Sequence, residues 1–333
     1  MNTGLARQPQ GGPRISVVVP VYRCTPCLEP LYERVSKAVE TIVDDFEVVF
    51  VDDRGGDGAW ELIGELSRRD RRVRGIRLSR NFGQHAAITA GLAAARGDWA
   101  IVMDCDLQDP PEEIPRLWAK AEEGYDIVYG RRKSKPTSAL RRLTARLYFK
   151  GMNVFTGAGV DGEFGSFSLI SRDVIDGFLR FRDQDRHYVF ILHWLGFDWA
   201  AVDYEPARRY EGESSYSMGH LLKHALNGVF FQTTVLLRWI VYFGFVLSSL
   251  GVLLAGYFIA ARVAGSAYPG WTSIAVIMLL ASGFIIASTG ITGLYIGKVF
   301  DQVKGRPLFV VDRELEHGAE HRPHQRARRE QML

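Results

Sequence analysis

The chain has 333 residues and a formal net charge of only +3, a balance that does not indicate nucleic acid as a partner. Its three cysteines are too few for a disulfide framework and fit a reducing compartment. The charged residues are unevenly distributed along the chain, because residues 239–261 and 271–297 contain no Asp, Glu, Lys or Arg. The rest of the chain is strongly charged, and its length allows two or three domains.

The first residues, 1–13, are polar and rich in Gly and Pro, which predicts a disordered tail. They lack the apolar segment of a signal peptide. Cys24 and Cys27 form a C-x-x-C pair that suggests zinc or redox chemistry. No second Cys/His pair with ligand spacing accompanies it, so two structural thiols are favoured.

Apolar runs and helical patterns then alternate along the chain, which is typical of an α/β domain with a parallel sheet. Both faces of such a sheet are covered, and the predicted strands carry apolar residues on both faces, as this requires. The predicted strands are 15–19, 46–51, 73–78 and 99–103, and the predicted helices are 28–43, 60–69 and 86–95.

Acidic and polar side chains follow the predicted strands: Tyr22, Asp52-Asp53, and the acidic segment with Asp104, Asp106 and Asp109. The carboxyl ends of parallel strands share one edge, where open α/β folds bind their ligands. Asp104 and Asp106 would share a face if the strand continued, and carboxylates with substrate phosphates suit Mg²⁺ or Mn²⁺. The alternative is an acidic turn that precedes a helix with Pro111 in its first turn. No G-x-G-x-x-G or Walker A pattern follows the first strand, which argues against a dinucleotide or P-loop site.

Four motifs occur in order: Val17-Val-Val-Pro20-Val-Tyr22, Val51-Asp52-Asp53, the segment 78–91 and Met103-Asp-Cys-Asp-Leu-Gln-Asp-Pro-Pro111. Together they resemble the family 2 GT-A glycosyltransferases. The similarity is strongest to the branch of dolichyl-phosphate mannose synthase and the bacterial polyprenyl-phosphate (undecaprenyl-phosphate) glycosyltransferases. It extends from about Ile15 through the apolar segments. It implies an α/β, Rossmann-like GT-A domain at 14–216 that uses a nucleotide-sugar donor.

The resemblance also implies roles for individual residues. Asp106 would be the main ligand of Mg²⁺ or Mn²⁺, with Asp104 beside it. The catalytic set would be Asp104, Asp106, Gln108 and Arg132. The donor-binding set would be Pro20, Tyr22, Asp52, Asp53, Asn81, Gln84, Arg209 and Ser214, the last two in a loop, 209–216, that closes over the donor diphosphate. Gly212 would give that loop its mobility.

A basic segment begins at Arg131, and such a run is commonly a solvated face. The resemblance instead implies an acceptor-phosphate site made of Arg131, Arg132, Ser138 and Arg186. An ionised phosphate monoester needs positioning and electrostatic help more than a general base. This agrees with the lack of an evident Ser-His-Asp or Cys-His arrangement.

The sequence departs from the family pattern at a few positions. Ser166 and Ser168 stand where Asp and Arg are frequent, Arg23-Cys24 where Asn-Glu is common, and Ser215 where Lys is frequent. These departures bear on donor identity and catalytic detail. The intact acidic motif favours an active enzyme of a subgroup.

The two uncharged segments predict a pair of transmembrane helices, 239–261 and 271–297, since the first alone would span about 34 Å as a helix. Segment 217–238 mixes apolar with basic residues and predicts an amphipathic juxtamembrane helix. Basic residues flank the pair (Lys223, Arg238, Lys298, Lys304 and Arg306), so both termini and the catalytic domain are expected in the cytoplasm. Segment 298–333 is expected to be a charged cytoplasmic tail, disordered from Glu314. Gly293-x-x-x-Gly297 could pack helices of a homo-oligomer.

The preferred hypothesis is an inverting, metal-dependent transferase of the cell membrane. It would move one sugar from a UDP- or GDP-sugar to polyprenyl (undecaprenyl or dolichyl) phosphate at the cytoplasmic face, for cell-envelope glycan or glycolipid modification. One alternative is transfer to a lipid-linked saccharide or a polysaccharide. Another is a non-catalytic membrane scaffold with a degenerate transferase domain.

Overall fold

The computed structural model describes residues 14–133, 164–184, 186–207, 235–263 and 270–322. The chain forms two compact units. One takes in residues 1–149, 158–214 and 307–333 and contains the sheet; the other takes in 150–157 and 215–306 and contains two long helices. The candidate site residues that the structure describes all belong to the first unit.

The described part of the first unit contains a nine-stranded sheet in the order β7-β5-β6-β4-β1-β2-β3-β8-β9. Strands β1 to β4 form its parallel centre, and β6, β8 and β9 run antiparallel to the strands beside them. The strands are β1 Ile15–Val21, β2 Phe46–Asp52, β3 Val73–Leu78, β4 Trp99–Val102, β5 Ile127–Arg132, β6 Phe164–Ser171, β7 Trp199–Tyr204, β8 Val311–Glu316 and β9 Ala319–His321.

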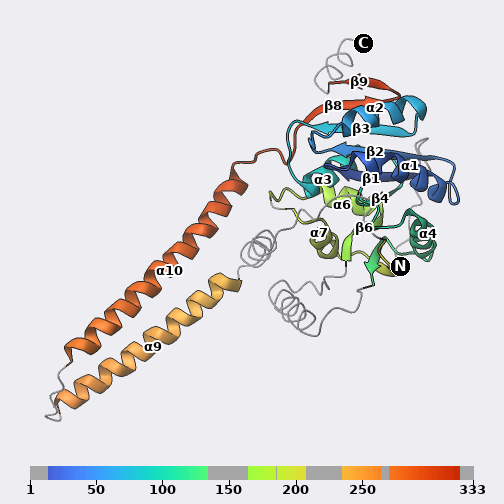
Figure 1. The fold of residues 1–333 in the computed structure, drawn as a ribbon. Coiled ribbons are helices and arrows are strands. Elements are labelled where there is room, and N and C mark those ends of the chain that lie inside the picture. Colours follow the sequence, from blue (N-terminus) through green and yellow to red (C-terminus); the bar gives the residue numbers. More distant parts are fainter. Residues whose placement is uncertain (1–13, 134–163, 185, 208–234, 264–269, 323–333) are drawn as a thin grey trace. The chain divides into compact units, whose positions relative to one another are not determined.

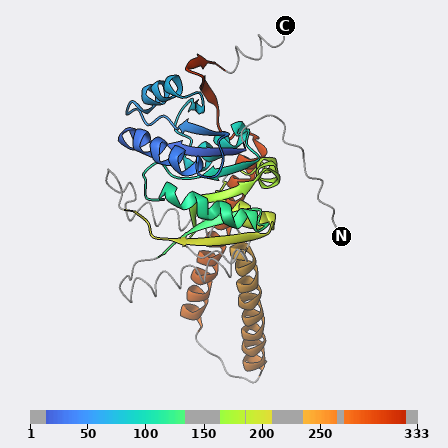
Figure 2. The same ribbon diagram turned by 90° about the vertical axis from the view of Figure 1, so that its right-hand side faces the viewer.

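Helices cover both faces of this sheet (Figure 1). They are α1 Thr25–Val39, α2 Ala59–Arg69, α3 Gln84–Ala94, α4 Ile114–Glu122 after the short turn η1 Pro111–Glu113, α6 Arg172–Arg180 and α7 Tyr188–Leu195. Alternate residues of β1 point to opposite faces: Val17 and Val19 join the core under α1, α2 and α4, whereas Val18 joins the core under α3, α6 and α7. Figure 2 shows α1 and α4 lying across their face of the sheet.

The four strands predicted in the first hundred residues and the three helices between them are confirmed, with bounds that shift by a few residues. These four strands pair in parallel, as expected, and the strands added on either side of them make the whole sheet mixed. The chain order makes β1 a switch point: β2 and β3 follow on one side of it, and β4 returns to its other side. The carboxyl ends of β1 and β4 therefore meet at the place where open α/β sheets bind their ligands.

The C-terminal segment differs most from its prediction. Residues 311–321, expected to belong to a charged tail that is disordered from Glu314, form the hairpin β8–β9 and extend the sheet beyond β3. His317 and Gly318, both with positive φ, form its two-residue turn. Leu315 is buried against Ile63, and three ion pairs match the charges: Arg54–Asp312, Arg96–Glu316 and Arg313–Glu320. High charge predicted disorder, but these charges are paired and the one large apolar side chain is buried.

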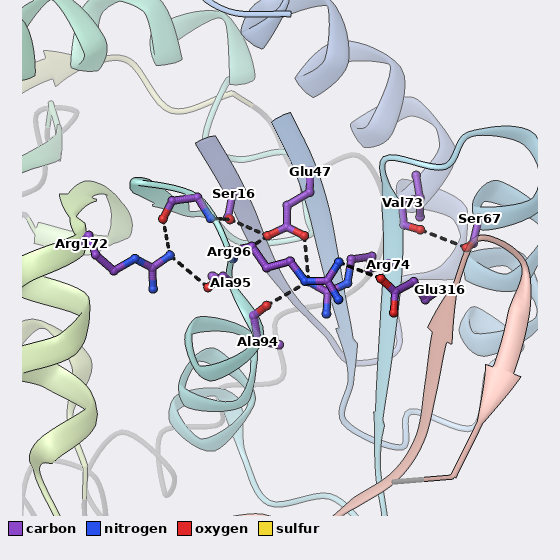
Figure 3. A network of polar contacts seen from close by, with 11 residues as sticks. Ser16, Glu47, Ser67, Val73, Arg74, Ala94, Ala95, Arg96, Arg172 and Glu316 are labelled. Atoms are coloured by element: carbon purple, nitrogen blue, oxygen red, sulfur yellow. Dashed lines mark hydrogen bonds and ion pairs between the residues drawn. The ribbon is translucent and has the colours of Figure 1, made fainter. Parts of the chain in front are cut away.

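A polar network joins the amino-terminal ends of the central strands (Figure 3). These ends lie opposite the carboxyl ends, where open α/β sheets bind their ligands. Glu47, which is only 4% exposed, accepts hydrogen bonds from the Ser16 hydroxyl, the Arg96 amide and the Arg74 guanidinium, each at 2.7 Å. Ser16 in turn accepts a bond from the Gly97 amide at 2.8 Å. One buried carboxylate therefore ties β1, β2, β3 and the α3–β4 connection together.

In the second unit, α9 (Val235–Val263) and α10 (Trp271–Val303) run side by side, and the Phe243 and Phe284 rings lie 5.0 Å apart (Figure 1). Within the described residues, one stretch is long and apolar enough to cross a membrane: Ala281–Val303 of α10, which is not buried. The apolar stretch of α9, Ile240–Gly251, is shorter. Helices are thus present at both predicted spans, and a two-helix membrane hairpin remains a prediction.

Replacing Glu47 by Gln should lower the free energy of unfolding by about 3 kcal/mol, because it leaves the buried Arg74 without its counter-charge. The matched control is Glu29→Gln, which removes an exposed ion pair with Arg69 and should cost less than about 1 kcal/mol. Thermal unfolding of the full-length protein in mild detergent, followed by tryptophan fluorescence, measures both. Equal melting temperatures for the two variants would contradict the role given to Glu47.

Candidate active site

The predicted convergence of polar groups at one edge of the sheet is confirmed, since β1, β2 and β4 are parallel neighbours. Asp104 and Asp106 do not lie on a continuing strand, however, because β4 ends at Val102 and a turn follows. That turn is held by Leu107, whose φ is +60° and whose side chain is buried in the core. A left-handed conformation is costly for a leucine, so its burial is what maintains the turn.

Asp104 contacts side chains from three elements outside the turn. Its Oδ1 accepts hydrogen bonds of 2.7 Å from Gln84 Nε2 and from the Ser166 hydroxyl, and its Oδ2 lies 3.9 Å from Arg132 Nη2. Burial, followed by repulsion from Asp109 and Asp106, raises the pKa of Asp104 to about 6. Side chains from three separate elements thus hold one carboxylate close to two others.

Asp106 and Gln108 lie in the same turn. Asp106 Oδ1 accepts a hydrogen bond of 3.1 Å from the Gln108 amide. Both residues are partly exposed to solvent.

Asp109, completely buried, forms the support behind the turn. Its Oδ1 accepts bonds from Arg132 Nε at 3.0 Å and Nη2 at 2.7 Å and from the Tyr204 hydroxyl. Burial raises the pKa of Asp109, and the nearby Arg132 opposes that rise. Burial alone would lower the pKa of Arg132, but Asp109 and Tyr204 raise it overall. The acidic turn and the end of β5 are therefore joined by an ion pair whose carboxylate is completely buried and whose guanidinium is 31% exposed.

Asp52 and Asp53, at the end of β2, are both buried and hold two neighbouring loops. The Asp53 carboxylate accepts the Phe82 and Gly83 amides at 2.7 and 2.8 Å, and Asp52 lies 3.1 Å from Arg77 Nε. Burial raises the pKa of both carboxyl groups. Asp53 therefore ties the end of β2 to the loop before α3, and Asp52 ties it to β3.

The remaining residues predicted to bind the donor differ in their exposure to solvent. Pro20 is buried in β1, whereas Tyr22 just beyond it is 43% exposed and stacks with Arg23. Asn81 is exposed in the loop before α3. Arg209 and Ser214 lie outside the described residues. The structure thus brings Tyr22 and Asn81 to the surface beside the strand ends and adds nothing on the loop 209–216.

The residues predicted to bind the acceptor phosphate differ in their burial and in their partners. Arg131 and Arg132 are consecutive on β5 and point to opposite faces; Arg131 pairs with Asp203 at 2.5 Å. Arg186 is buried, stacks on Phe178, and in the described structure its Nε and Nη1 have no hydrogen-bond partner. Burial lowers the pKa of Arg186. Ser138 lies outside the described residues.

The donor atoms at the turn fit a hard divalent cation. Among the described residues no group of three or more His, Cys, Asp or Glu side chains is arranged to hold a metal ion. Asp104 and Asp106 offer two carboxylates, and Mg²⁺ is commonly bound by one or two carboxylates together with substrate phosphates. Their mutual repulsion is what a bound cation would relieve.

Sequence reasoning missed three contributors to this site. Ser166 was noted as a departure, but its bond to Asp104 was not foreseen. Tyr204 and the supporting role of Asp109 were also missed, because Tyr204 is 95 positions from Asp109 in sequence. Ser168, the other departure, is buried and bonded to the Tyr188 hydroxyl at 2.8 Å, so it belongs to the core.

The geometry is that of a mixed α/β sheet with an acidic turn at its switch point, and residues 16–179 match the model of glycosyl transferase family 2. The chain belongs to this family, has the GT-A fold and is a glycosyltransferase. It is 34% identical to an uncharacterized glycosyltransferase, YkcC, of Bacillus subtilis (strain 168), over 90% of this chain and 93% of that one.

Two further relatives have more specific names. One is an undecaprenyl-phosphate 4-deoxy-4-formamido-L-arabinose transferase of Pseudomonas fluorescens (strain Pf0-1), 33% identical over 90% of each chain. The other is a prophage bactoprenol glucosyl transferase homolog of Escherichia coli (strain K12), 32% identical over 90% of this chain and 99% of that one. Among solved structures, glucosyl-3-phosphoglycerate synthase from Mycobacterium tuberculosis is 18% identical, with a TM-score of 0.46 over 66% of this chain and 77% of that one.

Replacing Asp109 by Asn should lower the free energy of unfolding by about 3 kcal/mol, because the Arg132 guanidinium keeps its charge and loses its buried partner. Tyr204→Phe is the matched control: it removes one hydroxyl, keeps the ring packed on Phe167, and should cost about 1 kcal/mol. Thermal unfolding and sugar transfer should both be measured. If Asp109→Asn proves as stable and active as the wild type, Asp109 does not support the site.

Proposed function

We propose that this enzyme transfers one sugar from a nucleoside diphosphate sugar to a polyprenyl phosphate, with inversion, at the cytoplasmic face of a membrane. The observation that carries the proposal is the acidic turn at the switch point, with Asp104 and Asp106 beside an arginine, Arg132, that Asp109 holds in place. The names of two relatives that align over about nine-tenths of this chain support a polyprenyl-phosphate acceptor.

Asp106 and Asp104 would hold Mg²⁺ or Mn²⁺ against the donor diphosphate. Such an ion stabilises the negative charge that develops on the leaving phosphate. The protein's own contribution is to fix the turn: Gln84 and Ser166 hold Asp104, and Leu107 anchors the backbone. A carboxylate held by two hydrogen bonds needs little reorganisation when the donor binds.

The acceptor phosphate would bring its own nucleophilic oxygen, so the site needs cations for positioning more than a base. Arg132 and the buried Arg186 are the candidates that the structure describes. Arg131 already pairs with Asp203, as Arg132 does with Asp109, so each would share its positive charge between that carboxylate and the acceptor phosphate. Arg209, Ser214 and Ser138 remain part of the proposal by sequence position.

Membrane attachment is part of the same proposal. The apolar stretch Ala281–Val303 supports one span, and the uncharged segment 239–261 supports a second. A polyprenyl phosphate is anchored in lipid, so an enzyme attached to the membrane would meet its acceptor at the surface.

The Ser166 hydroxyl also bears on the scaffold alternative. A degenerate domain would need no contact between Ser166 and Asp104, whereas the observed bond gives Ser166 a place in the site. We therefore infer that the Asp-to-Ser departure changes how Asp104 is held, and the transferase hypothesis is favoured.

Asp106→Ala should abolish binding of UDP or GDP in the presence of Mn²⁺ and should lower the transfer rate at least about a hundredfold, because one of two metal ligands is lost. Calorimetry and transfer of radiolabelled sugar from a panel of UDP- and GDP-sugars to undecaprenyl phosphate measure the two effects. The matched control is Asp126→Asn, an acid just before the first residue of β5 and so at the end of that strand away from Arg132. Nucleotide binding by Asp106→Ala as tight as in wild type would reject the metal site.

A wild-type protein that binds nucleotide and gives no lipid product would reject the polyprenyl-phosphate acceptor and favour a saccharide acceptor. A wild-type protein that binds no nucleotide with Mn²⁺ or Mg²⁺ would favour the scaffold.

A further inference from the structure

The strand β8, which follows the second long helix in the chain, lies against both loops that carry predicted donor residues. Ser79, at the end of β3, donates its amide to Val310 O at 2.8 Å. Phe309 and Val311 pack on the core cluster that also includes Phe82. The residues just before and within β8 thus contact the start of the loop that carries Asn81.

Arg54 connects this strand to the other loop. It directly follows Asp53, and its φ of +58° is a conformation that a non-glycine residue adopts at a cost. Its Nε donates to Leu78 O at 2.9 Å, and its Nη2 pairs with Asp312 Oδ2. The guanidinium is therefore held between the end of β3 and the carboxylate of β8.

The backbone around Arg54 has little freedom to adjust. Gly55 lies so close to the next loop that a Cβ there would be 2.6 Å from Arg23 N. Asp53, immediately before Arg54, binds the amides of Phe82 and Gly83. A change in the position of Arg54 would therefore move Asp53 and, through it, the loop 79–83.

We propose that Asp312 is a positioning residue for the donor pocket: it holds Arg54 and thereby fixes the loops 52–55 and 79–83 in the form that binds the nucleotide. The inference rests on the proposed function, because it assigns these loops to the donor. Asp312 lies only nine positions after Val303, the last residue of α10. The segment that leaves the apolar helix is thus also the segment that completes the pocket.

Asp312→Asn in the full-length protein tests the proposal, and Glu316→Gln is the matched control. Glu316 lies on the same strand and also pairs with an arginine, Arg96, but at the opposite edge of the sheet. The first measurement is amide hydrogen exchange of residues 52–56 and 79–83 without ligand. The second is calorimetry with UDP and with GDP in the presence of Mn²⁺.

Asp312→Asn should speed exchange in both loops and weaken nucleotide binding about tenfold, the effect of losing one charge-assisted hydrogen bond. Asp312→Glu should restore binding to within about threefold, because it keeps the charge. Glu316→Gln should leave both readouts at the wild-type value. Asp312→Asn and Glu316→Gln should have the same melting temperature. A difference in nucleotide binding between them would then reflect the position of the loops and not the stability of the protein.

If Asp312→Asn leaves hydrogen exchange in both loops unchanged, the proposal is overturned. It is also overturned if Glu316→Gln weakens nucleotide binding as much as Asp312→Asn does. The exchange measurement needs no ligand, so it tests the Arg54 link even if wild type binds neither nucleotide. A wild-type protein that binds neither nucleotide would instead reject the proposed function.

Discussion

The site depends on one electrostatic constraint: Asp109 is completely buried, and its charge must be balanced inside the protein. Arg132 from β5 and Tyr204 from β7 supply that balance, both on its Oδ1. The pairing fixes the acidic turn relative to β5, which is the next strand along the chain, and to β7, whose Tyr204 is 95 positions from Asp109. It also places a guanidinium 3.9 Å from Asp104, where a phosphate-bearing substrate would meet both signs of charge.

The same principle operates at each end of the central strands. At the ligand-binding edge, buried carboxylates of Asp52, Asp53 and Asp109 bind loop amides or arginines. At the opposite edge, Glu47 joins three strands (Figure 3). Each of these four carboxylates is matched by groups from a neighbouring element, so the fold holds the loops around them. Asp104 and Asp106 remain partly exposed, in agreement with the proposal that they bind a metal ion.

Much of the architecture was predictable because the early chain has strong local signals. Apolar runs that alternate with helical patterns identified β1 to β4, and parallel order then implied a shared edge for Tyr22, Asp52 and Asp104. The mixed part of the sheet was not predictable in this way. Strand β8 follows a long apolar helix and is rich in charge, and its stability comes from pairing with β3 and from the burial of Leu315, neither of which is a local property.

The sequence by itself therefore determined the fold class, the family resemblance and the acidic turn, because residue type and spacing express the preferences of strands, turns and hard-metal ligands. Tertiary structure alone decided which groups hold that turn. Ser166, Tyr204 and Asp312 are separated from their partners by 62, 95 and 258 positions. Their contacts arise only when the sheet brings distant strands together, and no local pattern encodes such a distance.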